Sequence, residues 1–219
     1  MIYTRKLLNK DEVKAIRRLS EHLAWEDGSV SSNAGPSVKK LIQAKQDEFH
    51  DEICQYVFDA LNADDIFLHS ILALTTTTPI ISKVNVGGYY KPHHDSYHVG
   101  DYSTTLFLND PDTYEGGELQ LYVDNQVKSF KPKAGHAVTY STGTPHCVTE
   151  VTSGERLAAV FWTTSKVKDP IMRGIISDLT FASENLKRIE PASLEKTMES
   201  PTFRVVRAVE ELLRRYGQS

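Results

Sequence analysis

The chain has 219 residues, of which 40% are hydrophobic, 25% are charged and 9% are aromatic. These fractions are those of an ordinary globular protein, and they exclude a disordered, collagen-like or disulfide-rich chain. The formal net charge is −4, so the protein offers no overall positive field to a phosphate backbone. We therefore expect no nucleic acid among its partners.

The longest apolar stretches, around residues 66–74 and 157–162, are shorter than a membrane span, and the N-terminal sequence lacks the apolar core of a signal peptide. The two cysteines, Cys54 and Cys147, lie far apart and form no CxxC pair. Neither a zinc knuckle nor a disulfide framework is expected from them. These features predict a cytoplasmic protein that binds no membrane.

Helical periodicity is found near both ends of the chain. Residues 9–25 and 46–61 each repeat apolar residues at helical spacing, and Asn9 and Glu12 occupy the positions of a capping box. The Gly- and Ser-rich stretch 28–37 between them is typical of a loop. After Lys168 the helical spacing returns and predicts two amphipathic helices.

The middle of the chain is rich in Thr, Val, Tyr and Phe, in short runs broken by Gly, Pro, Asn and Asp. We expect strands at residues 80–86, 94–98, 104–109, 118–123, 126–130, 137–141, 147–151 and 156–163. This pattern favours a sandwich or jelly roll. The sequence thus predicts one domain over residues 1–219, mainly β with flanking helices: an N-terminal helical part at 1–70, a core at 71–165 and C-terminal helices at 166–219.

Three of the eight histidines fall within residues 93–98. On a strand, positions two residues apart point to the same face, so His93 and Asp95 would present an imidazole and a carboxylate side by side. His146, at the start of a later strand, supplies a third ligand. Two histidines and one carboxylate form the facial triad of non-haem Fe(II) oxygenases, which leaves positions for dioxygen and a chelating cosubstrate.

Arg156 begins a strand whose same face also holds Ala158, Val160 and Trp162. A guanidinium on such a lining face requires an anion, and its fork fits a carboxylate in a bidentate manner. A dicarboxylate held at its far end by Arg156 could chelate the metal with its other end. The cosubstrate that fits this description is 2-oxoglutarate.

Four segments resemble those of iron- and 2-oxoglutarate-dependent dioxygenases of the prolyl 4-hydroxylase type, above all the PKHD-type hydroxylases. They are GGYYKPHHD at 87–95, STTLFLNDPDTYEGGELQLY at 103–122, KPKAGHAVTY at 131–140 and HCVTEVTSGERLAAVFWTTS at 146–165. A weaker similarity extends to LAWEDG at 23–28 and to SVK at 37–39, so nearly the full chain is covered. The resemblance implies a double-stranded β-helix (jelly-roll) core packed by N- and C-terminal α-helices.

Residue by residue, the resemblance implies Fe(II) on His93, Asp95 and His146, with Arg156 holding the far carboxylate of 2-oxoglutarate. It further implies a pocket lined by Thr105, Phe107, Leu119, Val148 and Trp162. The chain departs from the family at Val84, since relatives commonly have a tyrosine near the end of the first core strand. The residues that flank the ligands are expected at the substrate rim: Tyr89, Tyr90 and residues 98–102 with His98.

The predicted activity is that of an Fe(II)- and 2-oxoglutarate-dependent dioxygenase, an oxidoreductase that hydroxylates an aliphatic C–H bond and releases succinate and CO2. The resemblance favours a prolyl residue in a peptide or protein as substrate, with free amino acids and other small molecules as alternatives, and ascorbate (vitamin C) as a supporting reductant. The alternative hypothesis is a cupin-like metal-binding jelly roll, either an enzyme without 2-oxoglutarate or a sensor. A homodimer through a strand edge or the C-terminal helices is left open by the sequence.

Overall fold

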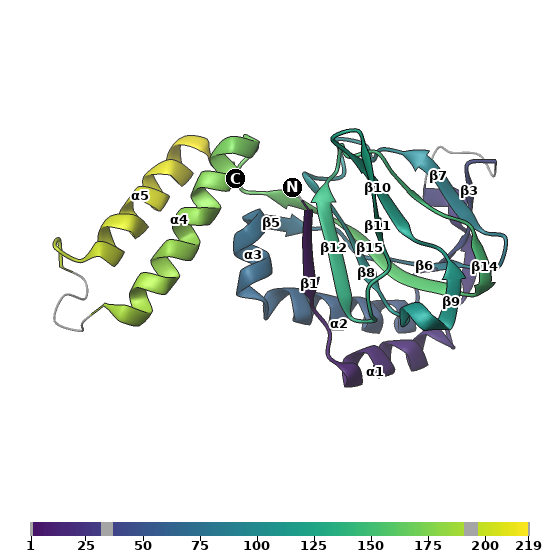
Figure 1. Ribbon diagram of the computed structural model, residues 1–219. Coiled ribbons are helices and arrows are strands. Elements are labelled where there is room, and N and C mark those ends of the chain that lie inside the picture. The colour runs from purple at the N-terminus through teal and green to yellow at the C-terminus, as the bar shows by residue number, and fades with distance from the viewer. Residues whose placement is uncertain (1, 32–36, 191–196, 219) are drawn as a thin grey trace. The chain divides into compact units, whose positions relative to one another are not determined.

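The structure is a computed structural model that describes residues 2–31, 37–190 and 197–218 (Figure 1). The chain divides into two compact units, one of residues 1–63 with 76–163 and one of residues 64–75 with 164–219. The first unit holds the sheets, and the second is mainly helical. The prediction of a single domain over the whole chain stays a prediction.

Two antiparallel sheets and a two-stranded ribbon build the first unit. The larger sheet runs in the order β1 (Ile2–Lys6), β12 (His136–Ser141), β8 (Tyr102–Phe107), β15 (Arg156–Ser165), β6 (Ile80–Val84), β4 (Ile42–Ala44) and β2 (Trp25–Asp27). The smaller sheet runs in the order β11 (Gln126–Phe130), β10 (Leu119–Val123), β13 (His146–Val148), β7 (Tyr89–His93) and β3 (Lys39–Lys40). The ribbon pairs β14 (Val151–Gly154) with β9 (Tyr114–Gly116).

Side chains from both sheets meet in a hydrophobic core. The larger sheet contributes three almost fully buried residues and the smaller sheet two: Phe107, Val138 and Tyr140, and Leu119 and Leu121. Along β10 the two buried leucines alternate with the more accessible Gln120 and Tyr122, which is the period of two of a half-buried strand. Two sheets packed face to face in this way form the predicted jelly roll, so the predicted fold class is confirmed.

The helices α1 (Lys10–Ser20) and α2 (Glu48–Asn62) pack against each other in the first unit (Figure 1). The N-terminus of α1 is fixed by the expected capping box, in which the Asn9 side chain accepts from the backbone of Glu12 and the Glu12 carboxylate accepts from the backbone of Asn9. Two short 3-10 helices, Gly28–Ser31 and Pro111–Thr113, join strands in this unit. Residues 32–36 of the predicted loop lie outside the described residues.

The strand predicted at residues 94–98 is wrong. The aromatic pair Tyr89 and Tyr90 begins β7, which ends at His93, and the next residues turn away from the sheet. Tyrosine favours a pleated sheet, whereas Asp95 and Ser96 favour turns. The strand predicted at 147–151 is likewise two strands, because β13 ends at Val148 and β14 begins at Val151.

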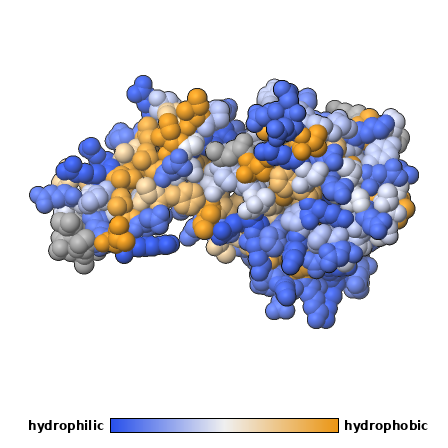
Figure 2. Space-filling model, in the orientation of Figure 1, coloured by the Kyte–Doolittle hydropathy of each residue, from blue (hydrophilic) through white to orange (hydrophobic). Residues whose placement is uncertain are grey.

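The second unit contains α3 (Asp65–Ile71), β5 (Ala73–Thr76), α4 (Pro170–Ile189) and α5 (Pro201–Tyr216). The helix pairs α3–α4 and α4–α5 are in contact, around a core of Leu72, Val167, Ile176 and Val209. Hydrophobic residues also gather on the surface over α4 and α5 (Figure 2), where Ile171 and Ile175 are exposed. The two predicted C-terminal helices are confirmed. In the part of the chain that the structure describes, no helix is long and apolar enough to span a membrane.

Candidate active site

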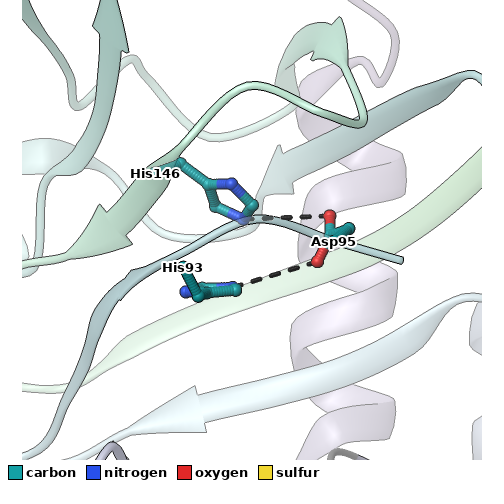
Figure 3. Close-up of side chains that lie close together, drawn as sticks. All are labelled: His93, Asp95 and His146. Atoms are coloured by element: carbon teal, nitrogen blue, oxygen red, sulfur yellow. Dashed lines mark ion pairs between the residues drawn. The ribbon is translucent and has the colours of Figure 1, made fainter. Parts of the chain in front are cut away.

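Three side chains with metal-ligating atoms converge in the first unit (Figure 3). His93 comes from the end of β7, Asp95 from the segment after it and His146 from the start of β13. The Nε2 atom of His93 lies 3.9 Å from Oδ1 of Asp95, and Nε2 of His146 lies 3.8 Å from Oδ2. The two histidines are cross-strand partners, since β13 and β7 pair with His146 opposite His93. Pairing between strands therefore brings the imidazoles together, and Asp95 joins them from outside the strand.

The two imidazoles are fixed in the tautomer that a metal requires. Nδ1 of His93 donates to the carbonyl of Lys91 at 2.8 Å, and Nδ1 of His146 donates to the carbonyl of Thr144 at 2.9 Å. Each Nε2 atom therefore keeps its lone pair on the side of Asp95. Burial, and then the neighbouring His146, lowers the pKa of His93 well below its ordinary value, which keeps the ring neutral. Neutral imidazoles with their other nitrogen bound to a carbonyl are typical of metal ligands.

The Asp95 carboxylate is held by two side chains of the larger sheet. The Ser103 hydroxyl on β8 donates to Oδ2 at 2.6 Å, and the Trp162 indole on β15 donates to the same oxygen at 2.9 Å. Ser103 and Trp162 lie opposite each other in the β8–β15 pairing, which explains why both reach one oxygen. One ligating atom from each residue of the triad lies within 4.8 Å of the others. This donor set fits Fe(II), which takes two imidazoles and a carboxylate on one face.

A cavity of about 630 Å³ extends from the triad between the two sheets. Five of the residues predicted for the cosubstrate site line it: Thr105, Leu119, Val148, Arg156 and Trp162. Phe107 does not; it lies in the hydrophobic core, where the Arg156 guanidinium is 5.0 Å from the centre of its ring. The structure therefore gathers the triad, the arginine and most of the predicted pocket around one space.

Arg156 is a buried cation that lines this cavity, with 2% of its surface exposed. No carboxylate of the described residues lies within ion-pair distance of it, and its Nε atom has no hydrogen-bond partner there. Burial lowers the pKa of Arg156, and the phenols of Tyr114 and Tyr140 counteract this effect. A buried guanidinium without a negative partner in the protein fits an anionic ligand such as the far carboxylate of 2-oxoglutarate.

The position of the family tyrosine, Val84, provides no hydroxyl group near Arg156, and the phenols near it come from other strands. Val84, where relatives commonly have a tyrosine, is the direct β6 partner of Arg156 and is fully buried. Tyr140 on β12 lines the cavity, and the hydroxyl of Tyr114 on β9 is buried with no hydrogen-bond partner among the described residues. Both phenols lie near enough to Arg156 to raise its pKa.

A glycine makes room for the Arg156 side chain. Gly117 has a φ of +67°, in the left-handed region that favours glycine. A Cβ atom at this position would lie 3.0 Å from Cγ2 of Val151 and 3.2 Å from Cδ of Arg156. The glycine therefore permits both the sharp turn before β10 and the close approach of the arginine.

Of the residues expected at the substrate rim, Tyr90 and Val99 line the cavity, whereas Tyr89 and His98 do not. The ring of Tyr90 lines it and stacks on His93 with 3.6 Å between centroids. The Tyr89 hydroxyl donates instead to the carbonyl of Ser37 at 3.5 Å, and the side chain does not line the cavity. His98 is exposed and lies against the ring of Tyr97 at 3.7 Å, also outside the cavity.

Among the residues of the site to which the sequence assigned no role are Lys39, Ser103 and Tyr140. Tyr140 belongs to the same face of its predicted strand as Val138, so period-two alternation could have placed it inside. Ser103 becomes visible only through the strand pairing that sets it opposite Trp162. Lys39 lies on the two-residue strand β3, which is too short to show any pattern.

Comparison with known proteins first gives the class of enzyme. Residues 80–164 match the 2OG-Fe(II) oxygenase superfamily. A prolyl-4-hydroxylase of Pseudomonas putida has a similar structure, with a TM-score of 0.56 and 20% sequence identity over 75% of this chain and 92% of that chain. So does a prolyl hydroxylase of Trichoplax adhaerens, solved in complex with a peptide fragment of the hypoxia inducible factor oxygen degradation domain (TM-score 0.56, 16% identity, 75% of this chain and 83% of that chain). The fold and the site define a 2-oxoglutarate-dependent Fe(II) oxygenase.

Related sequences then give the family. A PKHD-type hydroxylase of Gluconacetobacter diazotrophicus is 33% identical over 193 residues, which cover 82% of this chain and 84% of the relative. One from Shewanella sp. strain ANA-3 is 31% identical over 222 residues and covers 97% of this chain and 96% of the relative. The chain belongs to the PKHD-type hydroxylases and is a 2-oxoglutarate-dependent hydroxylase, as the sequence resemblance predicted. The family implies Fe(II) and 2-oxoglutarate, and the His–Asp–His site agrees with that requirement.

Proposed function

We propose that His93, Asp95 and His146 bind Fe(II), that Arg156 binds the far carboxylate of 2-oxoglutarate, and that the enzyme hydroxylates a prolyl residue in a peptide or protein. The observation that carries the cosubstrate assignment is the buried Arg156, which faces the same cavity as the triad without a carboxylate partner among the described residues. The prolyl assignment is supported by the structural similarity to two prolyl hydroxylases and by the Tyr90 ring at the cavity, a flat apolar surface that suits a proline ring.

When bound, Fe(II) with 2-oxoglutarate and dioxygen supplies the oxidant that hydroxylates a C–H bond, while the cosubstrate becomes succinate and CO2. Hydrogen bonds within the protein fix the orientation of the metal ligands. His93 and His146 present neutral nitrogen donors because their Nδ1 protons are bound to carbonyls. Ser103 and Trp162 bind one oxygen of Asp95 and so restrain the carboxylate in a single orientation.

The opposite end of the cavity is arranged for an anion. Arg156 offers a planar fork of donors that matches a carboxylate. Burial, and then the charge of Asp95, raises the pKa of Tyr140 well above its ordinary value, so the phenol keeps its proton and is available as a donor. The apolar side chains of Leu119, Val148 and Val160 also line the cavity and limit the access of water.

The metal and cosubstrate assignments are tested together by an anaerobic titration with Fe(II) and then 2-oxoglutarate, followed by the visible charge-transfer band of the chelated cosubstrate. We expect the band in the wild type and in the control His136→Ala, whose side chain lies outside the cavity. His146→Ala should abolish it, and Arg156→Met should require about tenfold to a hundredfold more 2-oxoglutarate, the effect of losing hydrogen bonds to a charged group. Fe(II) binding without a band would instead support the cupin-like enzyme or sensor.

The substrate assignment is tested with pairs of peptides that differ only by proline or alanine at one position. A prolyl hydroxylase should release more succinate with the proline peptide and add one oxygen atom to it, as detected by mass spectrometry. Turnover of both members of each pair would contradict the assignment. We also propose ascorbate as a supporting reductant, which should prolong succinate release in the same assay.

A further inference from the structure

The cavity contains a second buried cation besides Arg156. Lys39 on β3 has 8% of its surface exposed and lines the cavity from the smaller sheet, whereas Arg156 lines it from the larger sheet. Among the described residues that line the cavity, Asp95 is the one carboxylate. The two cations thus face one negative side chain, and that side chain belongs to the metal triad.

The contacts of Lys39 do not neutralise its charge. Its Nζ atom donates to the Ser31 hydroxyl at 2.8 Å and lies 5.1 Å from the centre of the Tyr90 ring. No carboxylate of the described residues lies within ion-pair distance of it. Burial lowers the pKa of Lys39 to about 8, and the charges of Asp95 and Asp27 counteract this effect. A buried ammonium without a carboxylate at ion-pair distance is costly for folding, and an anionic ligand that pairs with it would offset that cost.

Strand pairing places this ammonium beside the reacting centre. Lys39 lies opposite Tyr90, and Tyr90 lies opposite Val148, so the three residues form a row across the smaller sheet. The Tyr90 ring contacts Lys39 and also stacks on His93. A group bound to Lys39 would therefore lie one aromatic ring away from a residue of the triad.

The charges of the proposed complex balance without Lys39. The two positive charges of Fe(II) and the one of Arg156 are matched by Asp95 and the two carboxylates of 2-oxoglutarate. The ammonium of Lys39 is then the remaining charge of the cavity. Because low-polarity surroundings strengthen the attraction between opposite charges, this position favours an anionic group from a further ligand.

We propose that Lys39 determines the specificity of the enzyme by pairing with a carboxylate that the substrate carries near the hydroxylated carbon. This inference rests on the proposed function and deepens it, because it restricts the substrate to an anionic one. The carboxylate has two sources, the free α-carboxylate of an amino acid or C-terminal residue, and an acidic side chain beside the target residue in a peptide.

A neighbouring lysine provides a matched control. Lys40 follows Lys39 on β3 and is exposed on the opposite face of the strand, outside the cavity. Lys40→Met therefore removes the same charge from the same strand without changing the cavity. Lys39→Arg keeps a positive charge inside the cavity, whereas Lys39→Met removes it at similar volume.

The test measures binding to protein loaded with 2-oxoglutarate and with Zn(II) in place of iron, since Zn(II) has no redox chemistry and permits no turnover. The probes are two pairs of an acid and its neutral amide: N-acetylproline with N-acetylprolinamide, and the amidated peptide acetyl-Pro-Glu with acetyl-Pro-Gln. In the wild type and in Lys40→Met, we expect the acid of at least one pair to bind about tenfold to a hundredfold more tightly than its amide. This preference should disappear in Lys39→Met and return in part in Lys39→Arg. The pair that shows it identifies the source of the carboxylate.

Three results would overturn the inference: equal affinity for acid and amide, no binding of either acid, or a preference that survives in Lys39→Met. Thermal unfolding of each variant checks that the protein is folded. If Lys39→Met is not folded, Lys39→Gln replaces it, because glutamine also removes the positive charge. The charge-transfer band distinguishes a failure of the Lys39 role from a failure of the proposed function. A wild-type band without preference for the acids removes the role of Lys39 alone, whereas a missing band removes the proposed function as well.

Discussion

The indole nitrogen of Trp162 donates a hydrogen bond of 2.9 Å to Oδ2 of Asp95. Trp162 lies on β15, the strand that also carries Arg156. One strand of the larger sheet thus supports both the metal triad and the proposed anchor of the cosubstrate.

Trp162→Phe keeps an aromatic ring and removes this hydrogen bond. Because such supporting groups orient the ligands of a metal, we expect Fe(II) affinity to fall about tenfold to a hundredfold. Anaerobic titration with Fe(II), or with Co(II) as a spectroscopic substitute, measures the change. The control is Trp25→Phe, since Trp25 lies outside the cavity with the ammonium of Lys83 over its ring at 4.3 Å. Equal metal affinity in both variants would show that the hydrogen bond to Asp95 does not matter for binding.

Gly117→Ala should impair 2-oxoglutarate binding through Arg156. The left-handed backbone costs alanine about 1–2 kcal/mol, and the new methyl group would crowd the arginine side chain at Cδ. We expect a lower melting temperature together with a higher concentration of 2-oxoglutarate at half-saturation of the charge-transfer band. A variant that is destabilised but binds 2-oxoglutarate normally would show that the glycine serves the turn alone.

Gly174→Ala should stabilise the protein. Gly174 lies within α4, and an added Cβ would meet no atom within 4 Å. Alanine loses less conformational freedom than glycine on helix formation, so the free energy of unfolding should rise by about 0.5–1 kcal/mol. Gly217→Ala is the opposite case, because its Cβ would clash with the carbonyl oxygen of Leu213. Thermal unfolding should show a higher melting temperature for Gly174→Ala and a lower one for Gly217→Ala. A destabilised Gly174→Ala would contradict the prediction.

Cys54 should make stability fall at alkaline pH. Burial, and then the charge of Asp51, raises the pKa of Cys54 to about 12, whereas a thiol in the unfolded chain ionises near about pH 8.5. Because the folded state holds this proton more tightly, its contribution is complete below the unfolded pKa and is lost as pH rises toward the folded value. The difference in free energy of unfolding between wild type and Cys54→Ala should therefore shrink from about pH 7 to about pH 10. Urea unfolding at several pH values measures it, and a constant difference would refute the shift.

The convergence of His93, Asp95 and His146 could be predicted from the sequence, although the strand assigned to Asp95 was wrong, and the binding of Fe(II) by these residues stays a prediction. His93 and Asp95 were placed on one strand, but Asp95 lies beyond its end. Residue chemistry identified the triad, since two histidines and an aspartate followed by an arginine in a β-rich chain form the donor set of a non-haem iron site. Strand β10, which alternates clearly, and strand β15, which has a long apolar run, were also located closely.

The position of Lys39 at the cavity could not be predicted in the same way. Strands β2, β3 and β4 contain two or three residues each, too few for an alternating pattern to appear. Strand β3 pairs with β7 and β4 pairs with β6, both over long sequence separations, and the β3–β7 pairing decides that Lys39 faces the cavity while Lys40 faces away. Hydrogen bonds to Asp95 from two other strands are hidden from sequence reasoning for the same reason.

The position of Asp95 outside β7 has a consequence for how such an enzyme can change its specificity. The carboxylate accepts hydrogen bonds from Ser103 and Trp162, whereas Ser96 and Val99, which follow it in the same connection, line the cavity. The connection is therefore held near its start by the hydrogen bonds to Asp95, and it ends where β8 begins at Tyr102. Insertions and substitutions between these two points can remodel the entrance for new substrates during evolution while the metal-binding geometry is inherited unchanged.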